Sequence, residues 1–257
     1  MANTQARDSG RIALITGASY GVGAAIAAAL ARDGMDVALT ATRSENLASA
    51  IADVTATGRR AIPIELDLRS QTKIEDAVAK AIAAFGQIDV LVNNAGANLR
   101  RGALDVTRDE WDDVIGTNLT GTFFLTQAVG RHLMERRAPG SIITVSSTHG
   151  LVGAADRSTY GISKAALIQM TRMLAIEWAD HGIRVNAVAP GRLDTSSPSR
   201  ASTGSDKAYM EAMLKRIPLH RLATAEEIAG VVAFLAGPSA ASITGQTIVI
   251  DGGLTAA

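Results

Sequence analysis

The chain contains no cysteine and few aromatic residues, and both shortages limit what it can be. Without cysteine there are no disulfides, no thiolate nucleophile and no Cys-ligated metal site. The sequence offers no other cluster of metal ligands, so we expect no metal. The lack of cysteine is compatible with a reducing compartment, and we expect a cytoplasmic protein. Glycine, by contrast, is plentiful, with 24 residues that gather in clusters.

An excess of charge is also missing, since 25 Lys and Arg balance 25 Asp and Glu. A general binder of nucleic acid or of a membrane surface needs surplus Lys and Arg, so neither partner is expected. The most continuous apolar run, residues 24–31, is far shorter than the roughly 20 residues that span a bilayer. Residues 1–10 are polar and lack an apolar centre, so no signal peptide is expected.

Short apolar runs alternate with longer amphipathic runs along the chain. Such alternation implies parallel βαβ units, and continuous apolar strands indicate a sheet that is covered on both faces. We therefore expect an α/β fold, a single-domain Rossmann-type doubly wound parallel sheet of about seven strands with helices on both faces. The expected strands are 12–16, 37–40, 61–66, 88–92, 141–145, 183–188 and 247–250, and the expected helices include 22–32, 44–55, 70–85 and 158–180.

Local signals refine this organisation. Neither an internal repeat nor a long linker is visible, so we expect one domain over residues 11–257, after a polar tail of residues 1–10. Pro63 predicts an edge position for its strand. Thr107 with Glu110, and Thr224 with Glu227, predict capping boxes that open helices. The Ser- and Thr-rich stretch 192–206 is a candidate flexible lid within a substrate-loop segment of residues 192–216.

The first glycine cluster follows the first strand and precedes a small-residue helix. Gly17, Gly21 and Gly23 have the spacing G-x-x-x-G-x-G, which differs from the G-x-G-x-x-G fingerprint. Glycines permit a tight turn and close approach of a pyrophosphate, and the helix N-terminus offers N–H groups and a positive dipole end. The context favours nucleotide binding over an ordinary glycine-rich turn.

The end of the second strand distinguishes NAD from NADP. A carboxylate there would hold the adenosine ribose hydroxyls. Asp36 precedes the strand and lies at its wrong end, so we expect it to have a surface role. The carboxyl end carries Thr42 and Arg43, and a guanidinium pairs well with a 2′-phosphate. NADP(H) is therefore favoured over NAD(H); the alternative is that Arg43 points into solvent.

Tyr160 and Lys164 are four residues apart at the start of an expected helix and share one face. A fixed cation favours the phenolate and lowers the pKa of a tyrosine, which makes the pair a workable proton donor and acceptor. Ser147 follows the fifth strand, at the edge where open α/β sheets bind ligands, and its hydroxyl could hydrogen-bond a substrate oxygen. No nucleophile elbow surrounds it. His149 is either a substrate contact or a bystander.

These residues belong to an ordered series of motifs, and with them the sequence resembles the short-chain dehydrogenase/reductase family from residue 11 to residue 253. The resemblance implies a Rossmann-type fold, a nicotinamide cofactor and a tetrameric assembly. The motifs are TGASYGVG at 16–23, Asp67 with Leu68, NNAG at 93–96, Asn118, Ser147, Tyr160 with Lys164, Pro190 and Gly191 with Thr195, and GQTIVIDGG at 245–253.

The resemblance also implies a cofactor site. Tyr20 stands where the family often has Arg or Ser, which leaves Thr42 and Arg43 to carry any preference for NADP. Asn93 is expected to have a purely structural role. The implied contacts are Gly17, Ser19, Tyr20, Gly21, Val22 and Gly23 with the pyrophosphate, Asp67 and Leu68 with the adenine, Asn94, Ala95 and Gly96 with the adenosine ribose, Tyr160 and Lys164 with the nicotinamide ribose, and Pro190, Gly191, Leu193 and Thr195 with the nicotinamide end.

The catalytic set implied by the resemblance is Asn118, Ser147, Tyr160 and Lys164. Ser147 and Tyr160 would bind a carbonyl oxygen, Tyr160 would donate the proton, and Lys164 would hold the nicotinamide ribose. Asn118 would kink its helix and support proton supply. The expected activity is NADPH-dependent reduction of a ketone to a secondary alcohol, as in 3-oxoacyl-carrier-protein reductases.

Two alternatives remain open at this point. A sugar-acid or gluconate-type dehydrogenase is also similar, and Arg100 and Arg101 could then meet a substrate carboxylate, or be solvated or lie at a subunit contact. A remote alternative is a nucleotide-binding regulator without catalysis. His149 and Arg192 are tentative substrate contacts. Phe123, Phe124 and Leu125 suit a buried helix face, either in the core or in a homotetramer interface.

Overall fold

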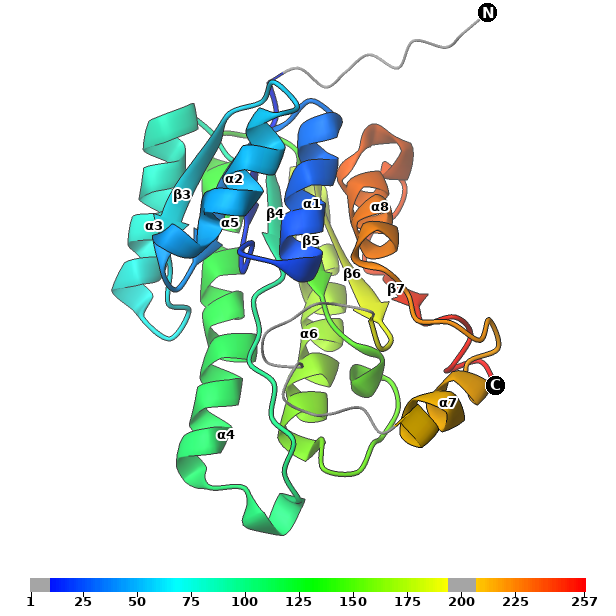
Figure 1. Cartoon of the computed structure of the whole chain (residues 1–257). Helices are drawn as coiled ribbons and strands as arrows, with labels where there is room; N and C mark the ends of the chain where they lie inside the picture. Colours follow the sequence, from blue (N-terminus) through cyan, green and yellow to red (C-terminus); the bar gives the residue numbers. More distant parts are fainter. Residues whose placement is uncertain (1–9, 194–206) are drawn as a thin grey trace, which may run out of the picture.

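The computed structural model describes residues 10–193 and 207–257 of the chain. Within them, a seven-stranded sheet has the order β3-β2-β1-β4-β5-β6-β7, with every pair parallel. The expected doubly wound fold is confirmed (Figure 1). The strands are β1 (Ile12–Ile15), β2 (Asp36–Ala41), β3 (Ala61–Glu65), β4 (Val90–Asn93), β5 (Gly140–Val145), β6 (Ile183–Pro190) and β7 (Thr247–Ile250).

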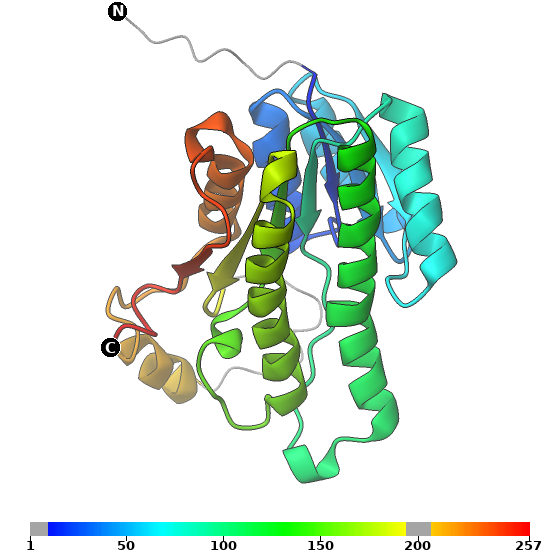
Figure 2. The same cartoon turned by 180° about the vertical axis from the view of Figure 1, so that it is seen from behind.

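Helices cover both faces of this sheet. One hydrophobic core lies under α1, α2 and α8, and the other under α3, α5 and α6 (Figures 1 and 2). None of the described helices is both long and apolar enough to cross a membrane. The α-helices are α1 (Gly21–Arg32), α2 (Ala48–Thr55), α3 (Gln71–Phe85), α4 (Arg108–Ile115), α5 (Thr122–Glu135), α6 (Ser158–Glu177), α7 (Lys207–Lys215) and α8 (Ala225–Ala236).

Most expected elements are present, with shifted ends. β3 lies at the edge of the sheet, as Pro63 predicts, and both capping boxes form. The expected helix 158–180 ends at Glu177, because a short 3-10 turn and then Gly182, with a φ of 70°, follow. The expected substrate-loop segment contains α7, while residues 1–9 and 194–206 lie outside the described residues.

The expected surface role of Asp36 is wrong. Its position at the amino end of β2 is as expected, but the side chain is buried, at 6% exposure. Its carboxylate pairs with Arg59 at 2.8 Å and with Arg60 at 2.9 Å, and it also accepts a bond from the Arg60 backbone N–H. Burial alone would raise the pKa of Asp36, but these partners hold it below its ordinary value. Asp36 therefore joins the start of β2 to the residues that precede β3.

A π-helical segment, Gly116–Gly121, interrupts the long helix between α4 and α5. Such segments are local insertions that often mark functional sites. Gly121 lies so close to Leu68 that a Cβ on it would overlap the Leu68 carbonyl oxygen. This contact fixes the π segment against the loop that follows β3. It also requires glycine at position 121.

Replacing Gly121 by Ala should therefore lower the thermal midpoint by several degrees. The added Cβ meets backbone rather than a flexible side chain, and such overpacking costs about 1–3 kcal/mol. The matched control is Gly230→Ala, on an exposed face of α8 where a Cβ meets nothing within 4 Å. That change should hold or raise the midpoint, because Ala is the better helix former. Equal midpoints for both variants, measured by calorimetry, would contradict the packing described here.

Candidate functional site

The predicted site residues gather at the carboxyl ends of the strands. The order of the sheet reverses direction between β1 and β4, so the chain leaves these neighbouring strands toward opposite sides. Open α/β sheets bind ligands in the crevice at such a point. The glycine turn after β1 and the NNAG motif after β4 both lie here. Ser147 follows β5 in the same way, and α6 brings Tyr160 and Lys164 beside it.

The glycine turn is tied to the motif after β4. The Thr16 hydroxyl accepts bonds from the backbone N–H groups of Asn94 at 2.9 Å and Ala95 at 3.0 Å. The Asn94 side-chain amide donates to the carbonyls of Thr16 at 3.0 Å and Gly17 at 2.9 Å. A Cβ on Gly23 would overlap the Gly17 carbonyl oxygen. The two loops therefore hold each other, and Asn94 has a structural role beside the expected one.

The amino end of α1 fits a phosphate. Tyr20 precedes it with an extended backbone, and neither a side-chain cap nor an acidic residue in the first turn satisfies its N–H groups. Uncapped N–H groups and the helix dipole favour an anion. The observed turn thus suits the dinucleotide pyrophosphate that the motif predicts.

The carboxyl end of β2 lies beside the glycine turn, on the side where the adenosine is expected. The Ala18 backbone N–H donates to the Thr40 carbonyl at 2.9 Å, which places the turn against the carboxyl end of β2. Thr42 and Arg43 follow directly and are exposed. Asp36 lies at the opposite end of the strand, away from this side. Arg43 thus follows β2 at the end of the strand where the adenosine ribose is expected, and Asp36 lies at the other end.

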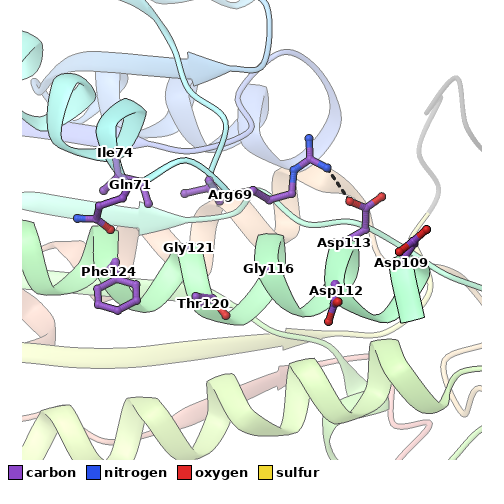
Figure 3. Close-up of a pocket in the computed structure, with 11 residues that line it drawn as sticks. Arg69, Gln71, Ile74, Asp109, Asp112, Asp113, Gly116, Thr120, Gly121 and Phe124 are labelled. Atoms are coloured by element: carbon purple, nitrogen blue, oxygen red, sulfur yellow. Dashed lines mark hydrogen bonds and ion pairs between the residues drawn. The ribbon is translucent and has the colours of Figure 1, made fainter. Parts of the chain in front are cut away.

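Asp67 and Leu68 follow β3, where the adenine is expected. Leu68 is buried, and the Asp67 carboxylate accepts two bonds from the Arg69 guanidinium, at 2.9 and 3.1 Å. These bonds lower the pKa of Asp67. Arg69 also reaches Asp113 of α4 at 2.6 Å, across one end of a hollow of about 560 Å³ (Figure 3). This hollow lies between the helix formed by α4 and α5 and the segment from Leu68 to Ile74, and none of the predicted catalytic residues line it.

The Lys164 ammonium lies inside the protein beside the π segment. It is 4% exposed and donates to the Val145 carbonyl of β5 at 2.8 Å. Burial lowers its pKa to about 8, so it still carries its charge at neutral pH. Its Nζ atom is 5.7 Å from the centroid of the Tyr160 ring. A Cβ on Gly96 would come within 3.5 Å of Nζ, so the ammonium borders the NNAG loop.

Asn118 connects three parts of the site. Its Oδ1 atom accepts from the Ala97 backbone N–H at 2.6 Å, and its Nδ2 donates to the Ala97 carbonyl at 2.9 Å and to the Ser163 hydroxyl at 3.0 Å. Ser163 in turn donates to the Tyr160 carbonyl at 2.7 Å. The expected distortion of the helix at Asn118 is observed as the π segment. Asn118 therefore fixes the turn of α6 that carries Tyr160.

Ser147 and His149 face Tyr160 across the site. The Ser147 hydroxyl accepts from the His149 backbone N–H at 3.2 Å and lies 3.3 Å from the ring atom Nδ1. The rings of His149 and Tyr160 meet edge to face, with centroids 6.0 Å apart. Burial, and secondarily the charge of Arg157, lower the pKa of His149, so its imidazole is neutral at pH 7. Ser147 is thus linked through His149 to the Tyr160 ring, and Lys164 lies on another side of that ring.

Other predicted residues have mixed outcomes. A Cβ on Gly191 would lie 2.9 Å from the Asp251 side chain, Leu193 pairs with Ala223, and Thr195 lies outside the described residues. The Asn93 amide donates to the hydroxyls of Thr126 and Thr144, which supports its structural role. Among the described residues, no group of three or more His, Asp and Glu side chains could hold a metal ion.

Sequence reasoning missed several residues of the site. Arg157 donates to Asn98 Oδ1 at 2.6 Å and to the Leu99 carbonyl at 3.2 Å, and so joins the NNAG loop to α6. Arg157 is the N-cap residue of α6 and lies outside the helix, so helical spacing gave no signal for this role. Ser163 and Arg69 carried no signal in the sequence either. Arg100 and Arg101, considered for a substrate carboxylate, have ion-pair partners in Asp156 at 4.0 Å and Glu110 at 2.6 Å.

Comparison with known proteins agrees with this geometry. A family model described as enoyl-(acyl carrier protein) reductase matches residues 17–255. The 3-oxoacyl-[acyl-carrier-protein] reductase of Escherichia coli is 43% identical, over 95% of this chain and 97% of that protein. The chain belongs to the short-chain dehydrogenase/reductase family. Members of this family are oxidoreductases, and this chain is an enzyme of that class.

Relatives that are named as gluconate-type dehydrogenases are also similar to this chain. The 2-dehydro-3-deoxy-D-gluconate 5-dehydrogenase of Dickeya dadantii is 36% identical over 95% of each chain. A solved structure of a candidate 2-deoxy-D-gluconate 3-dehydrogenase from Agrobacterium tumefaciens, with bound NADP, has a TM-score of 0.89 and 33% identity, and covers 97% of this chain and 98% of that one. Relatives of both expected kinds, 3-oxoacyl reductases and gluconate-type dehydrogenases, are therefore found.

Proposed function

We propose that the enzyme reduces a ketone to a secondary alcohol with NADPH, using Ser147, Tyr160 and Lys164. The observation that carries this proposal is the meeting of these residues at the switch-point crevice, with a buried ammonium 5.7 Å from the Tyr160 ring. An alcohol can be oxidised by the same groups in reverse. The presence of the whole set argues against a nucleotide-binding regulator without catalysis.

The roles follow from the chemistry of each group. NADPH, when bound, supplies a hydride for the carbonyl carbon. Ser147 and Tyr160 hydrogen-bond the carbonyl oxygen, where negative charge develops. Tyr160 then gives its phenolic proton to that oxygen, and the nearby Lys164 charge stabilises the phenolate that remains. Lys164 also holds the nicotinamide ribose, and Asn118 keeps the Tyr160 turn of α6 in place.

A preference for NADPH is proposed from Arg43. It is exposed beside the glycine turn, where it can pair with a 2′-phosphate, while Asp36 is buried at the far end of β2. The solved relative that contains NADP supports this choice. A 3-oxoacyl-like ketone is the first candidate substrate, because the Escherichia coli relative is named for that activity. A sugar acid is the second, supported by the Dickeya relative.

We also propose a homotetramer, located in the cytoplasm. Leu125 is in the core, but Phe123 and Phe124 are 37% and 39% exposed and form an edge-to-face pair on the outer side of α5. A hollow borders each ring: Phe124 lines one between the α4–α5 helix and the start of α3, and Phe123 lines another between α5 and α6. Burial of this face against a second copy would cover these rings. Light scattering after gel filtration tests this, and a monomer at micromolar concentration would refute it.

The role of Tyr160 predicts that Tyr160→Phe retains nucleotide binding but loses about 10²–10⁴-fold in kcat, because the proton donor is gone while the ring remains. NADPH oxidation with a 3-oxoacyl ester measures turnover, and calorimetric titration measures binding. The control is Thr57→Val, which removes an exposed hydroxyl just before β3, at the amino ends of the strands, and should keep its turnover. Normal turnover by Tyr160→Phe would show that the mechanism is wrong.

The role of Arg43 predicts that Arg43→Ala weakens NADPH binding by about 10- to 100-fold and leaves NADH binding unchanged, because a charge-assisted pair with the 2′-phosphate is lost. The control is Arg32→Ala, at the far end of α1. Dissociation constants for both nucleotides should be measured for each protein. A wild-type preference for NADH, or equal losses for the two nucleotides, would refute the NADP assignment.

A further inference from the structure

The Ser147 hydroxyl contacts two groups of a single residue. It accepts a hydrogen bond from the His149 backbone N–H at 3.2 Å, and the ring atom Nδ1 of His149 lies 3.3 Å from the same oxygen. A serine hydroxyl has one O–H to donate and lone pairs that accept two further bonds. The backbone bond fills one of the two acceptor positions. The use of the other position, and of the serine proton, therefore depends on Nδ1.

The turn that carries His149 is packed against α6. The Ser146 hydroxyl donates to the Lys164 carbonyl at 2.8 Å. A Cβ on Gly150 would lie 2.8 Å from the Lys164 carbonyl oxygen, and a Cβ on Gly161 would lie 2.9 Å from the His149 carbonyl oxygen. Glycine permits such close approach of one backbone segment to another. The imidazole is therefore attached to a backbone that is held against the catalytic part of α6.

The position of the imidazole proton decides where the serine proton points. Burial lowers the pKa of His149, so at pH 7 one ring nitrogen has a proton and the other has none. A bare Nδ1 would accept the serine O–H and leave Oγ with only lone pairs for a substrate oxygen. A protonated Nδ1 instead donates to Oγ, whose own O–H is then left for the substrate. Only the second arrangement stabilises a carbonyl oxygen on which negative charge develops.

We propose that His149 is a positioning residue that acts through Ser147: its Nδ1–H donates to Ser147 Oγ and so directs the serine O–H to the ketone oxygen. This inference rests on the proposed ketone reduction and names a further residue that the reaction uses. The ring of His149 also packs edge to face against Tyr160, with centroids 6.0 Å apart. The test must therefore separate the hydrogen bond from the packing.

Two variants of His149 separate these effects. His149→Phe keeps an aromatic ring beside Tyr160 but has no donor, and it should lower kcat with an acetoacetyl thioester about 10-fold. His149→Asn has no ring, but its amide N–H reaches the place of Nδ1, so kcat should stay within about threefold of the wild type. The KM for NADPH should change by less than about threefold in both variants. Equal rates in the two variants, or a loss in His149→Asn alone, would contradict the proposal.

A double-mutant cycle with Ser147→Ala shows whether His149 acts through the serine. Because Ser147→Ala removes the hydroxyl, adding His149→Phe should change the remaining kcat by less than about twofold. Packing of the ring on Tyr160 does not need the serine, so an effect of that kind would lower kcat by the same factor in both backgrounds. Additive losses would overturn the inference. The control is His181→Phe, at an exposed histidine just before the amino end of β6, which should keep its turnover.

The tautomer of His149 can be measured without turnover. The chain has four histidines, so NMR of protein labelled with nitrogen-15 in the imidazole rings gives few signals, and His149→Phe assigns those of interest. At pH 7, with NADP⁺ bound, Nδ1 of His149 should carry the proton and Nε2 should carry none. A proton on Nε2 would overturn the inference.

This measurement distinguishes failure of the inference from failure of the proposed function. A proton on Nδ1, in an enzyme that reduces no ketone, would support the bond between His149 and Ser147 and refute the ketone reductase. A proton on Nε2, in an enzyme that reduces the thioester, would refute the inference and leave the proposed function in place.

Discussion

The buried ammonium of Lys164 is the constraint on which the rest of the site depends. A charged group is costly to bury unless it is hydrogen-bonded, and the Val145 carbonyl at the end of β5 supplies such a bond. Burial lowers the pKa of Lys164 to about 8, so the cation persists at neutral pH. A cation held there acts on the neighbouring Tyr160 ring through a medium of low polarity, where its influence is strong.

Keeping that ammonium in place requires the surrounding loops to take one arrangement. Lys164 Nζ lies beside Gly96 of the NNAG loop, and Asn118 holds the adjoining Ala97 with bonds to both its N–H and its carbonyl. The π segment that positions Asn118 is fixed in turn by the contact of Gly121 with Leu68. The cofactor loops after β3 and β4 and the catalytic turn of α6 are therefore parts of one packed unit.

Much of the fold could be predicted, because the strands are continuous apolar runs and the motifs follow them in order. Ser147, Tyr160 and Lys164 could be placed together because parallel strands end at one edge of a sheet. The buried position of Asp36 could not be predicted. Its carboxylate pairs with Arg59 and Arg60, which directly precede β3 and are far from Asp36 in the sequence. The same is true of Arg157, whose partners Asn98 and Leu99 are far from it in the sequence.

The most direct test of this account is the ionisation of Lys164 itself. The chain has five lysines, so an NMR titration of protein labelled at the lysine side chains gives few signals, and Lys164→Met assigns the one of interest. The account predicts one lysine signal that titrates near pH 8 and is absent from the variant. A Lys164 signal that titrates at the ordinary lysine pKa of about 10.4 would show that the amine is solvated and would contradict the account.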